Sequence, residues 1–369
     1  MKIGLTGGHL TPALAVIEEL KRYKEVNLFF VGRTNTMEGD PSPSPESVII
    51  PNLGVKFYSI KTGRLQRKFT KFTLPSLTKI PFGFIQSILI LLKEKPNLLI
   101  SFGSYVAVPV SVAAWILRIP ILTHEQTFKG GLANRFISKV AKRIAVSWES
   151  SIKHFPSKKV FVSGNPVRAE IISVKKKRTN RSVIYITGGN QGAHVINVIL
   201  AEILSNLLKK YEVVHQCGGS ESYKDFEMLS ALSSQWPKKI KNRYKLSKWY
   251  KTAELAEIFS KTDLVVGRSG ANIVNEVAIL GIPAVFIPLE IAAYGEQMDN
   301  AKVLAERGAA IILPEGRLTP KRLLAAIEFV FKDYREYKKK AKAAGKLINK
   351  NAAKVIVDEA FRMVNVPKT

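Results

Sequence analysis

The sequence has little of what a secreted or membrane-spanning protein needs. It contains one cysteine, Cys217, so an internal disulfide is excluded, which fits a reducing compartment. The most apolar run, 80–92, includes Pro81, Gly83 and Gln86 and is shorter than the roughly 20 apolar residues that span a bilayer. The first residues, MKIGLTGGHLTPALAV, have glycines where a signal peptide would be apolar. We therefore expect neither a signal peptide nor a transmembrane segment.

Acidic residues are scarce relative to basic ones. The chain has 29 Asp and Glu against 57 Lys and Arg, which gives a formal net charge of +28. Such an excess predicts an anionic partner, and charge alone does not choose among nucleic acid, acidic lipid and a phosphorylated substrate. Hydrophobic residues make up 46% of the 369 residues, so the composition is that of a folded protein, with length enough for two domains.

Several common catalytic signatures are missing. The chain has no Walker A loop and no G-x-G-x-x-G, which disfavours a P-loop kinase and a standard NAD dehydrogenase. It also has no CxxC, HExxH or D-x-D spacing, so we expect no metal site and no cofactor. A bound diphosphate would then be held by main-chain amides, a helix N-terminus and Arg168.

Short β-rich runs alternate with helical patterns, which predicts parallel sheets covered by helices, an α/β fold. The expected strands are Lys2–Leu5, Asn27–Val31, Asn97–Phe102, Pro120–Thr123, Val183–Thr187, Glu212–His215, Thr262–Val266 and Pro283–Ile287. The expected helices are Pro12–Tyr23, Val106–Leu117, Ala193–Lys209 and Asn272–Leu280. The turn TGGH at 6–9 is echoed by TGGNQG at 187–192, which predicts two similar Rossmann-like halves.

A polar, basic segment, SVKKKRTNRS at 173–182, indicates where the two halves are joined. We expect a first domain over 1–163 and a second over 164–345. A C-terminal helix from about 346 to 369 is expected to pack back on the first domain.

Glycine and polar residues in both halves gather directly after the expected strands. Ligands of doubly wound sheets bind beyond the carboxyl ends of the strands, so a cleft between the two halves is the expected site. Glycine lets the backbone approach a phosphate, and the following helix start supplies N–H groups. Tight strand–helix turns alone would also explain these glycines. The residues so placed are Gly7, Gly8, His9, Gly103, Ser104, Tyr105, His124, Glu125 and Gln126 in the first half and Gly188, Gly189, His215, Gln216, Ser269 and Gly270 in the second.

Some of these side chains suit chemistry on an alcohol or a sugar. An imidazole in general titrates near neutrality, so His9 could take a proton from a hydroxyl, although a structural histidine is the simpler interpretation. Glu276 could accept two hydrogen bonds from a ribose diol or could lie on the surface. Glu296, Gln297 and Asn300 suit sugar hydroxyls and equally suit helix caps.

The segment 61–92 alternates basic and aromatic residues, which is typical of a surface that lies on an anionic bilayer. A core helix with a solvated basic face would give the same pattern. Nucleic acid is not expected, because no recognised nucleic-acid motif accompanies the segment. The residues expected to meet lipid are Arg64, Arg67, Lys68, Phe69, Lys71, Phe72, Phe82 and Phe84.

Six segments together resemble the MurG family, the peptidoglycan N-acetylglucosaminyltransferases. They are GLTGGHLTPALAVIEEL at 4–20, SFGSYVAVPVSVAAWILRIPILTHEQTFKGGLANR at 101–135, SGNPVRAEI at 163–171, ITGGNQGAHVIN at 186–197, HQCG at 215–218 and GRSGANIVNEVAILGIPAVFIPL at 267–289. The resemblance implies a GT-B fold and an inverting, metal-independent transfer from UDP-N-acetylglucosamine to undecaprenyl-linked muramyl-pentapeptide (lipid I), giving lipid II. It also implies a peripheral protein on the cytoplasmic face of the membrane.

The resemblance also assigns residues. It implies catalytic roles for His9 and Glu125. The implied substrate contacts are Thr6, Gly7, Gly8, Tyr105, His124, Thr127, Arg168, Asn190, Gln191, Tyr250, Ser269, Gly270, Ala271, Glu276, Glu296, Gln297 and Asn300.

The chain departs from the family pattern at five positions. Leu5 and Ser104 stand where the family has Gly, and Leu5 is expected in a loop that needs close backbone approach. Thr127 replaces Asn, Asn190 replaces Ser, and Glu296 stands where Gln is common. These departures leave two alternatives open: another lipid-directed UDP-sugar transferase, of the diacylglycerol type, and an inactive nucleotide-sugar or nucleic-acid binding protein.

Overall fold

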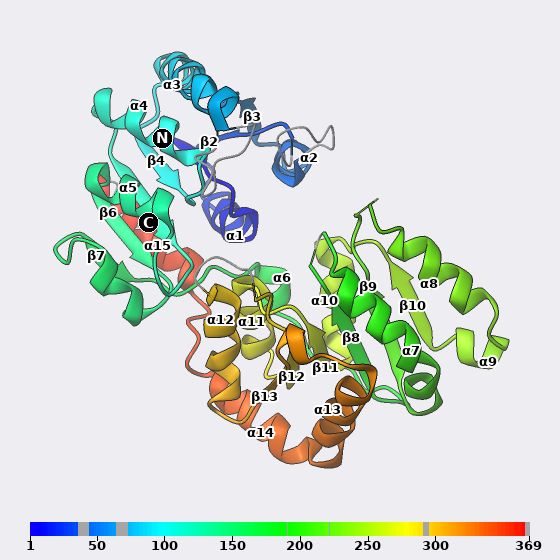
Figure 1. Ribbon diagram of the computed structural model, residues 1–369. Coiled ribbons are helices and arrows are strands. Elements are labelled where there is room, and N and C mark those ends of the chain that lie inside the picture. Colours follow the sequence, from blue (N-terminus) through cyan, green and yellow to red (C-terminus); the bar gives the residue numbers. More distant parts are fainter. Residues whose placement is uncertain (36–43, 64–72, 190, 221, 291–294, 366–369) are drawn as a thin grey trace. The chain divides into compact units, whose positions relative to one another are not determined.

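The computed structural model describes residues 1–35, 44–63, 73–189, 191–220, 222–290 and 295–365 (Figure 1). The chain divides into two compact units. The first unit comprises Met1–Arg168 and Asn349–Thr369, and the second comprises Ala169–Ile348. Residues 164–168, expected in the second domain, therefore belong with the first.

The first unit contains a seven-stranded parallel sheet of order β3-β2-β1-β4-β5-β6-β7. Its strands are β1 (Lys2–Thr6), β2 (Asn27–Gly32), β3 (Lys56–Ser59), β4 (Leu98–Ser101), β5 (Ile121–Glu125), β6 (Arg143–Val146) and β7 (Val160–Val162). Its helices are α1 (Leu10–Leu20), α2 (Pro45–Asn52), α3 (Thr73–Glu94), α4 (Ala107–Ile116), α5 (Leu132–Val140), η1 (Glu149–His154) and α15 (Ala352–Met363).

Helices cover both faces of this sheet, which is why its central strands are apolar throughout. Phe30 faces a core that includes residues of α1 and α15, whereas Phe29 and Val31, one residue to either side, face a core built with α3, α4 and α5. A Cβ on Gly4 would lie 2.7 Å from the Phe29 ring, so the neighbouring strand packs closely there.

The expectation that Leu5 lies in a loop is wrong. This residue lies inside β1, fully buried in the first core, and does not belong to the loop. The turn begins only at Gly7. The apolar side chain that replaces Gly at this position therefore fills the core and leaves the backbone of the turn unobstructed.

The last helix of the chain, α15, packs against α1 on the same face of the first sheet (Figure 1). Phe361 meets Tyr23 edge to face with ring centroids 4.8 Å apart. Arg143, on β6, pairs with Glu359 of α15. The first core is thus built from both ends of the chain.

The second unit contains a six-stranded parallel sheet of order β10-β9-β8-β11-β12-β13. Its strands are β8 (Val183–Thr187), β9 (Glu212–Gln216), β10 (Tyr244–Ser247), β11 (Thr262–Gly267), β12 (Ala284–Phe286) and β13 (Ala310–Ile312). Its helices are α6 (Ala169–Ile172), α7 (His194–Lys210), α8 (Asp225–Ser234), α9 (Lys238–Lys241), α10 (Thr252–Lys261), α11 (Ala271–Ile279), α12 (Glu296–Ala305), η3 (Glu315–Arg317), α13 (Pro320–Lys332) and α14 (Tyr334–Gly345).

The basic segment 173–182 is mostly exposed, but it is not a detached linker. Lys176 donates to the carbonyl oxygen of Thr262 at 2.8 Å and pairs with Asp263 at 2.8 Å. Lys177 pairs with Glu257 at 2.7 Å. The segment is therefore held along the second unit by lysine contacts.

Candidate functional site

The turn after β1 has no room for side chains at its two glycines. Gly7 has a φ of +140°, and a Cβ there would lie 2.8 Å from the carbonyl carbon of Phe102. A Cβ on Gly8 would lie 2.6 Å from Oγ of Ser104. Residues 9–13 form the start of α1 and are all described. They include neither a side chain that caps the helix nor an acidic residue. The Gly8 N–H is bonded to the carbonyl oxygen of Gly103 at 3.2 Å, so it is the start of α1 that presents main-chain N–H groups and a partial positive charge, which suit an anion.

His9 is the N-cap residue of α1 and is half-buried. Its Nδ1 lies 2.7 Å from the carbonyl oxygen of Phe102. A carbonyl oxygen only accepts, so Nδ1 carries the hydrogen and Nε2 is left as the basic nitrogen of the neutral ring. This arrangement is what a general base at the end of β1 requires.

Glu125, at the end of β5, is fully buried and holds the loop that follows. One carboxylate oxygen accepts the N–H of Thr127 at 2.8 Å. The other accepts the N–H of Gly131 at 2.8 Å and Nδ2 of Asn134 at 3.0 Å. Both oxygens are therefore committed to protein groups, and the geometry favours loop positioning over the catalytic role expected from the sequence. Asn134, on α5, was not singled out by the sequence, because nothing local marks an asparagine inside a helix as a loop anchor.

His124 is buried next to Glu125 and bonds within the protein. Its Nε2 lies 3.3 Å from the carbonyl oxygen of Gly164 and 3.2 Å from Oγ of Ser147. Burial lowers the pKa of His124 to about 4, so the ring is neutral near pH 7. These contacts give His124 a structural role, and the substrate contact expected for it stays a prediction.

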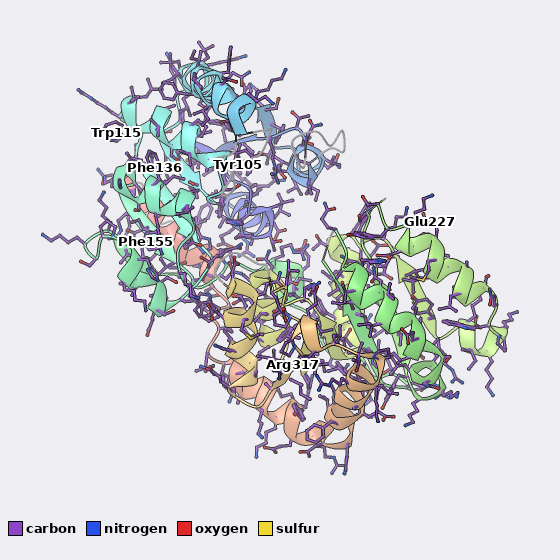
Figure 2. All side chains as sticks on the ribbon, viewed as in Figure 1. Tyr105, Trp115, Phe136, Phe155, Glu227 and Arg317 are labelled. Carbon is purple, nitrogen blue, oxygen red and sulfur yellow. The ribbon has the colours of Figure 1, made fainter. Side chains whose placement is uncertain are left out.

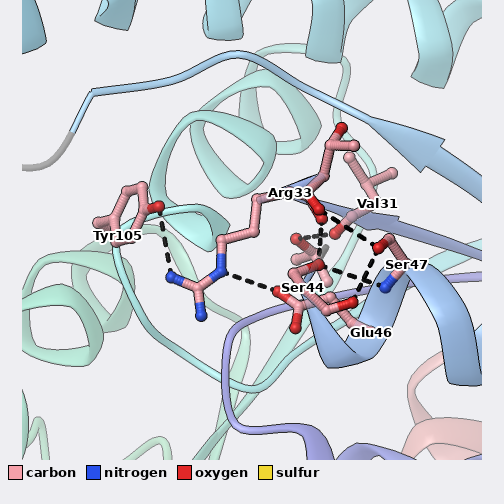
Figure 3. A network of polar contacts seen from close by, with 8 residues as sticks. Val31, Arg33, Ser44, Glu46, Ser47 and Tyr105 are labelled. Carbon is pink, nitrogen blue, oxygen red and sulfur yellow. Dashed lines mark hydrogen bonds and ion pairs between the residues drawn. The ribbon is translucent and has the colours of Figure 1, made fainter. Parts of the chain in front are cut away.

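Tyr105 follows β4 and belongs to a polar network with Arg33 and Glu46 (Figure 3). Nη1 of Arg33 donates to the Tyr105 hydroxyl at 3.4 Å, and Nε of Arg33 lies 3.0 Å from the Glu46 carboxylate. No motif in the sequence singles out Arg33. Its only local signal is its position directly after a strand, at the edge where ligands bind.

The turn after β8 in the second unit is as tight as the first. A Cβ on Gly188 would lie 2.3 Å from the backbone nitrogen of Ala193, and one on Gly192, whose φ is +82°, would lie 2.1 Å from the carbonyl oxygen of Cys217. Gln191 is exposed on this turn, whereas Asn190 lies outside the described residues. The turn leads directly into α7.

The start of α11 offers a second N-terminus at the same edge of this sheet. Gly270 is its N-cap in an extended conformation, and residues 270–274, all described, include neither a side-chain cap nor an acidic residue. Ala271 is the first helical residue, and Glu276 is buried further along the same helix.

A set of polar residues from α12 is tied to the loop before α11. Ser269 donates from Oγ to the carbonyl oxygen of Gln297 at 2.7 Å, and Asn300 donates to the carbonyl oxygen of Ser269 at 3.1 Å. The side-chain oxygen of Gln297 accepts the N–H of Leu289 at 3.0 Å. Three predicted site residues, Ser269, Gln297 and Asn300, are thus brought together. Glu296 is partly exposed at the first position of α12.

The remaining predicted residues are further apart. Thr6 is buried and donates from Oγ1 to the carbonyl oxygen of Val31 at 2.8 Å, so its side chain holds β1 to β2. Arg168 is the last residue before the second unit. Tyr250 lies between β10 and α10, and burial raises its pKa to about 12.

A hydrophobic stripe lies on the exposed face of α3. Phe82, Ile85, Leu89 and Leu92 recur at helical spacing and are between 50% and 66% exposed. Phe84 corrects an expectation, because it packs against the core that α3 shares with α4 and α5 and does not share the exposed stripe. The other residues expected to meet lipid, Arg64, Arg67, Lys68, Phe69, Lys71 and Phe72, lie outside the described residues.

The described residues contain no group of three or more His, Cys, Asp and Glu side chains arranged to hold a metal ion. Among them, likewise, there is no helix with both the length and the apolarity that crossing a bilayer takes.

Two parallel-sheet units, each with a glycine turn that opens into a helix at the carboxyl edge, define a GT-B glycosyltransferase fold. Models of the glycosyltransferase family 28 N-terminal and C-terminal domains match residues 1–146 and 183–359. The crystal structure of MurG from Acinetobacter baumannii matches with a TM-score of 0.69 and 26% identity, covering 98% of this chain and 99% of that one. A UDP-GlcNAc 2-epimerase from Neisseria meningitidis, in complex with UDP-GlcNAc, shares the fold at a TM-score of 0.66 and 16% identity, over 98% and 100% of the two chains.

Curated relatives identify the family more narrowly than the fold does. The UDP-N-acetylglucosamine–N-acetylmuramyl-(pentapeptide) pyrophosphoryl-undecaprenol N-acetylglucosamine transferase of Treponema denticola is 33% identical over 372 residues, covering 96% of this chain and 95% of the relative. The Borrelia hermsii protein of the same name is 31% identical over 88% of this chain and 85% of its own. The chain belongs to the MurG family of glycosyltransferases, and the resemblance expected from its motifs is confirmed.

Proposed function

We propose that the protein transfers N-acetylglucosamine from UDP-N-acetylglucosamine to the muramyl-pentapeptide of lipid I, releasing UDP and lipid II. The observation that carries this proposal is the near full-length match to transferases with that name, because it covers both units and both glycine turns. The second unit would hold the donor, and the carboxyl edge of the first unit would hold the acceptor.

The reaction we propose is a single inverting displacement. The acceptor hydroxyl oxygen attacks the anomeric carbon while the bond from that carbon to the UDP oxygen breaks, and UDP leaves with the electron pair. Nε2 of His9 takes the hydroxyl proton, since its Nδ1 hydrogen is already engaged with Phe102. Glu125 and Asn134 contribute by holding the loop 126–131 beside this site.

The leaving diphosphate would be stabilised by the protein's main chain. The N-termini of α7 and α11, which follow the Gly188–Gly192 turn and Gly270, supply N–H groups at the carboxyl edge of one sheet. We place the ribose against Glu276 and the donor sugar against Gln297 and Asn300, and we propose that no metal takes part.

The exposed stripe on α3 supports a peripheral position on the membrane. Its four apolar residues project from the first unit, and Trp115 at the end of α4 is also more than half exposed (Figure 2). A net charge of +28 favours an anionic leaflet, and we place the protein on the cytoplasmic face, whose surface is anionic.

The test is a turnover assay with UDP-N-acetylglucosamine and a lipid I analogue. We expect UDP release to match formation of the disaccharide lipid, and to stop when the acceptor is omitted. Diacylglycerol as acceptor and UDP-glucose as donor serve as matched controls. Faster UDP release with diacylglycerol would contradict the acceptor assignment, and salt-sensitive DNA binding without any UDP release would contradict the enzyme assignment.

A further inference from the structure

Arg33 and Tyr105 meet across the end of β1. Arg33 directly follows β2, and Tyr105 follows β4, and these two strands flank β1 on either side. The two side chains are joined by the 3.4 Å hydrogen bond, and the guanidinium carbon lies 5.7 Å from the centre of the Tyr105 ring (Figure 3). The contact therefore spans the strand end from which the Gly7–Gly8 turn leads into α1.

The guanidinium of Arg33 is fixed rather than mobile. Glu46, whose side chain is only 3% exposed, pairs with Nε, and Ser44 donates from Oγ to the carbonyl oxygen of Arg33. Both ends of the arginine are thus tied to the first turn of α2, as Figure 3 shows. The side chain remains 24% exposed, so an incoming group can reach it.

A guanidinium has five N–H donors in a planar fork that matches phosphate and carboxylate groups. Within the described part of the chain, Glu46 and Tyr105 engage two of them. The N-terminus of α1 adds partial positive charge at the same sheet edge, where neither a side-chain cap nor an acid in residues 9–13 offsets it. The fork and the helix start would thus attract the same anion.

We propose that Arg33 binds an oxyanion of the acceptor beside the glycine turn of the first unit, a step that rests on the proposed function. The acceptor carries two sources of such a group, its pyrophosphate and the carboxylates of its peptide. Tyr105 and Glu46 act as positioning residues that hold the fork in place.

A purely structural role makes a different prediction. If the Arg33–Glu46 pair only ties α2 to the sheet, substitutions lower the melting temperature and leave both substrate KM values unchanged. Arg33→Lys separates the two roles, because lysine keeps the charge for Glu46 but lacks the planar fork. Arg22→Lys is the matched control, since Arg22 is exposed just beyond the end of α1 and pairs with the buried Glu19 at 2.9 Å.

The experiment measures acceptor binding by calorimetry and KM for each substrate in the wild type, Arg33→Lys, Arg33→Gln and Arg22→Lys. We expect Arg33→Lys to raise the acceptor KM and Kd about tenfold and to leave the donor KM unchanged. Arg33→Gln should raise the acceptor KM further, and Arg22→Lys should change nothing. An acceptor analogue without peptide distinguishes the sources: an equal loss with both acceptors assigns the pyrophosphate, and a loss confined to the pentapeptide acceptor assigns a carboxylate.

Two outcomes overturn the inference. The first is an unchanged acceptor KM in Arg33→Lys, and the second is an equal rise in the donor KM. If the wild type binds the acceptor and transfers sugar while Arg33→Lys behaves the same, only the role of Arg33 fails. If the wild type neither binds lipid I nor transfers sugar, the proposed function fails as well.

Discussion

The imidazole of His9 and the backbone of Phe102 are joined by a 2.7 Å contact between Nδ1 and the carbonyl oxygen. Phe102 directly follows β4, so the hydrogen bond links the turn after β1 to the neighbouring strand. It fixes both the tautomer and the orientation of the ring. A ring held in this way would need no rearrangement to accept a proton at Nε2.

Replacing His9 should therefore lower kcat far more than it weakens binding. We expect His9→Ala to reduce kcat by roughly 10²–10⁴-fold with little change in the donor KM, the range typical of general-base loss. His9→Gln can still donate to Phe102 but cannot take the proton, so it should be equally slow. His154→Ala is a histidine control in η1. Full turnover of His9→Ala at saturating substrates would exclude the base role.

Glu125→Gln tests loop positioning against catalysis. The substitution puts an amide where two N–H donors converge, so a buried hydrogen bond is lost and the free energy of unfolding should fall by about 2 kcal/mol. Asn134→Ala should cause a comparable loss, because it removes one of those donors. Urea denaturation measures both variants. A Glu125→Gln protein of unchanged stability with abolished turnover would favour the catalytic role instead.

Ser104 holds a backbone conformation that suits glycine, with a φ of +69°. Ser104→Gly should raise the free energy of unfolding by about 1 kcal/mol, because a side chain is strained in this region. Ser104→Ala keeps the strain and removes only the hydroxyl, so it should bring no gain. Thermal denaturation of the two variants measures the difference, and equal stabilities would show that the backbone is relaxed.

Acid should destabilise the protein through its buried histidines. Burial lowers the pKa of His215 to about 3, and Nε2 and Nδ1 lie within 3.0 Å of Asn197 Oδ1 and Tyr244 Oη. The unfolded ring has a pKa near 6.5, so between about pH 6.5 and pH 3 the unfolded state binds a proton that the folded state does not. The full stability contribution is therefore present above pH 6.5 and is lost as pH falls.

The measurement is the unfolding free energy in urea at pH 7 and pH 5. His215→Gln removes the titrating ring, so its stability should fall by less between the two pH values than that of the wild type. The wild-type slope from one such histidine approaches about 1.4 kcal/mol per pH unit. Identical slopes in the two proteins would mean that His215 titrates normally in the folded state.

The α3 stripe should govern membrane association. Phe82→Ser combined with Leu89→Ser removes two exposed apolar side chains, so binding to vesicles that contain anionic lipid should weaken about tenfold or more. Phe329→Ser is the matched control, because Phe329 is equally exposed on α13 of the second unit. Flotation with and without anionic lipid gives the comparison. Equal loss in the control would mean that the stripe has no special role.

The parts of the fold that could be predicted are those whose burial shows in the sequence. Val183–Thr187 reads as a strand because a central parallel strand is apolar on both faces. The edge strand β3, with the sequence KFYS, is half exposed and carries no such signal. The polar network of His215 with Asn197 and Tyr244 was equally invisible, since its members come from three different elements.

The sequence marks candidate site residues by their type but not their geometry. The glycine turns and His9 could be read from the sequence, whereas the tautomer of His9 depends on a carbonyl 93 positions away. Arg33 and Tyr105 are 72 positions apart in the sequence, so the sequence alone does not show that they are in contact. Glu125 reads as a candidate acid or base, and only its three donors show that it anchors a loop.

Because α15 completes the core beneath α1, the second unit is in effect an insertion within the first. During synthesis the ribosome completes the whole second unit before α15 emerges, although α15 is part of the core of the first unit. The second unit can thus fold on the nascent chain, while the core of the first unit is completed last, when Ile356 and Phe361 of α15 cover its remaining apolar surface.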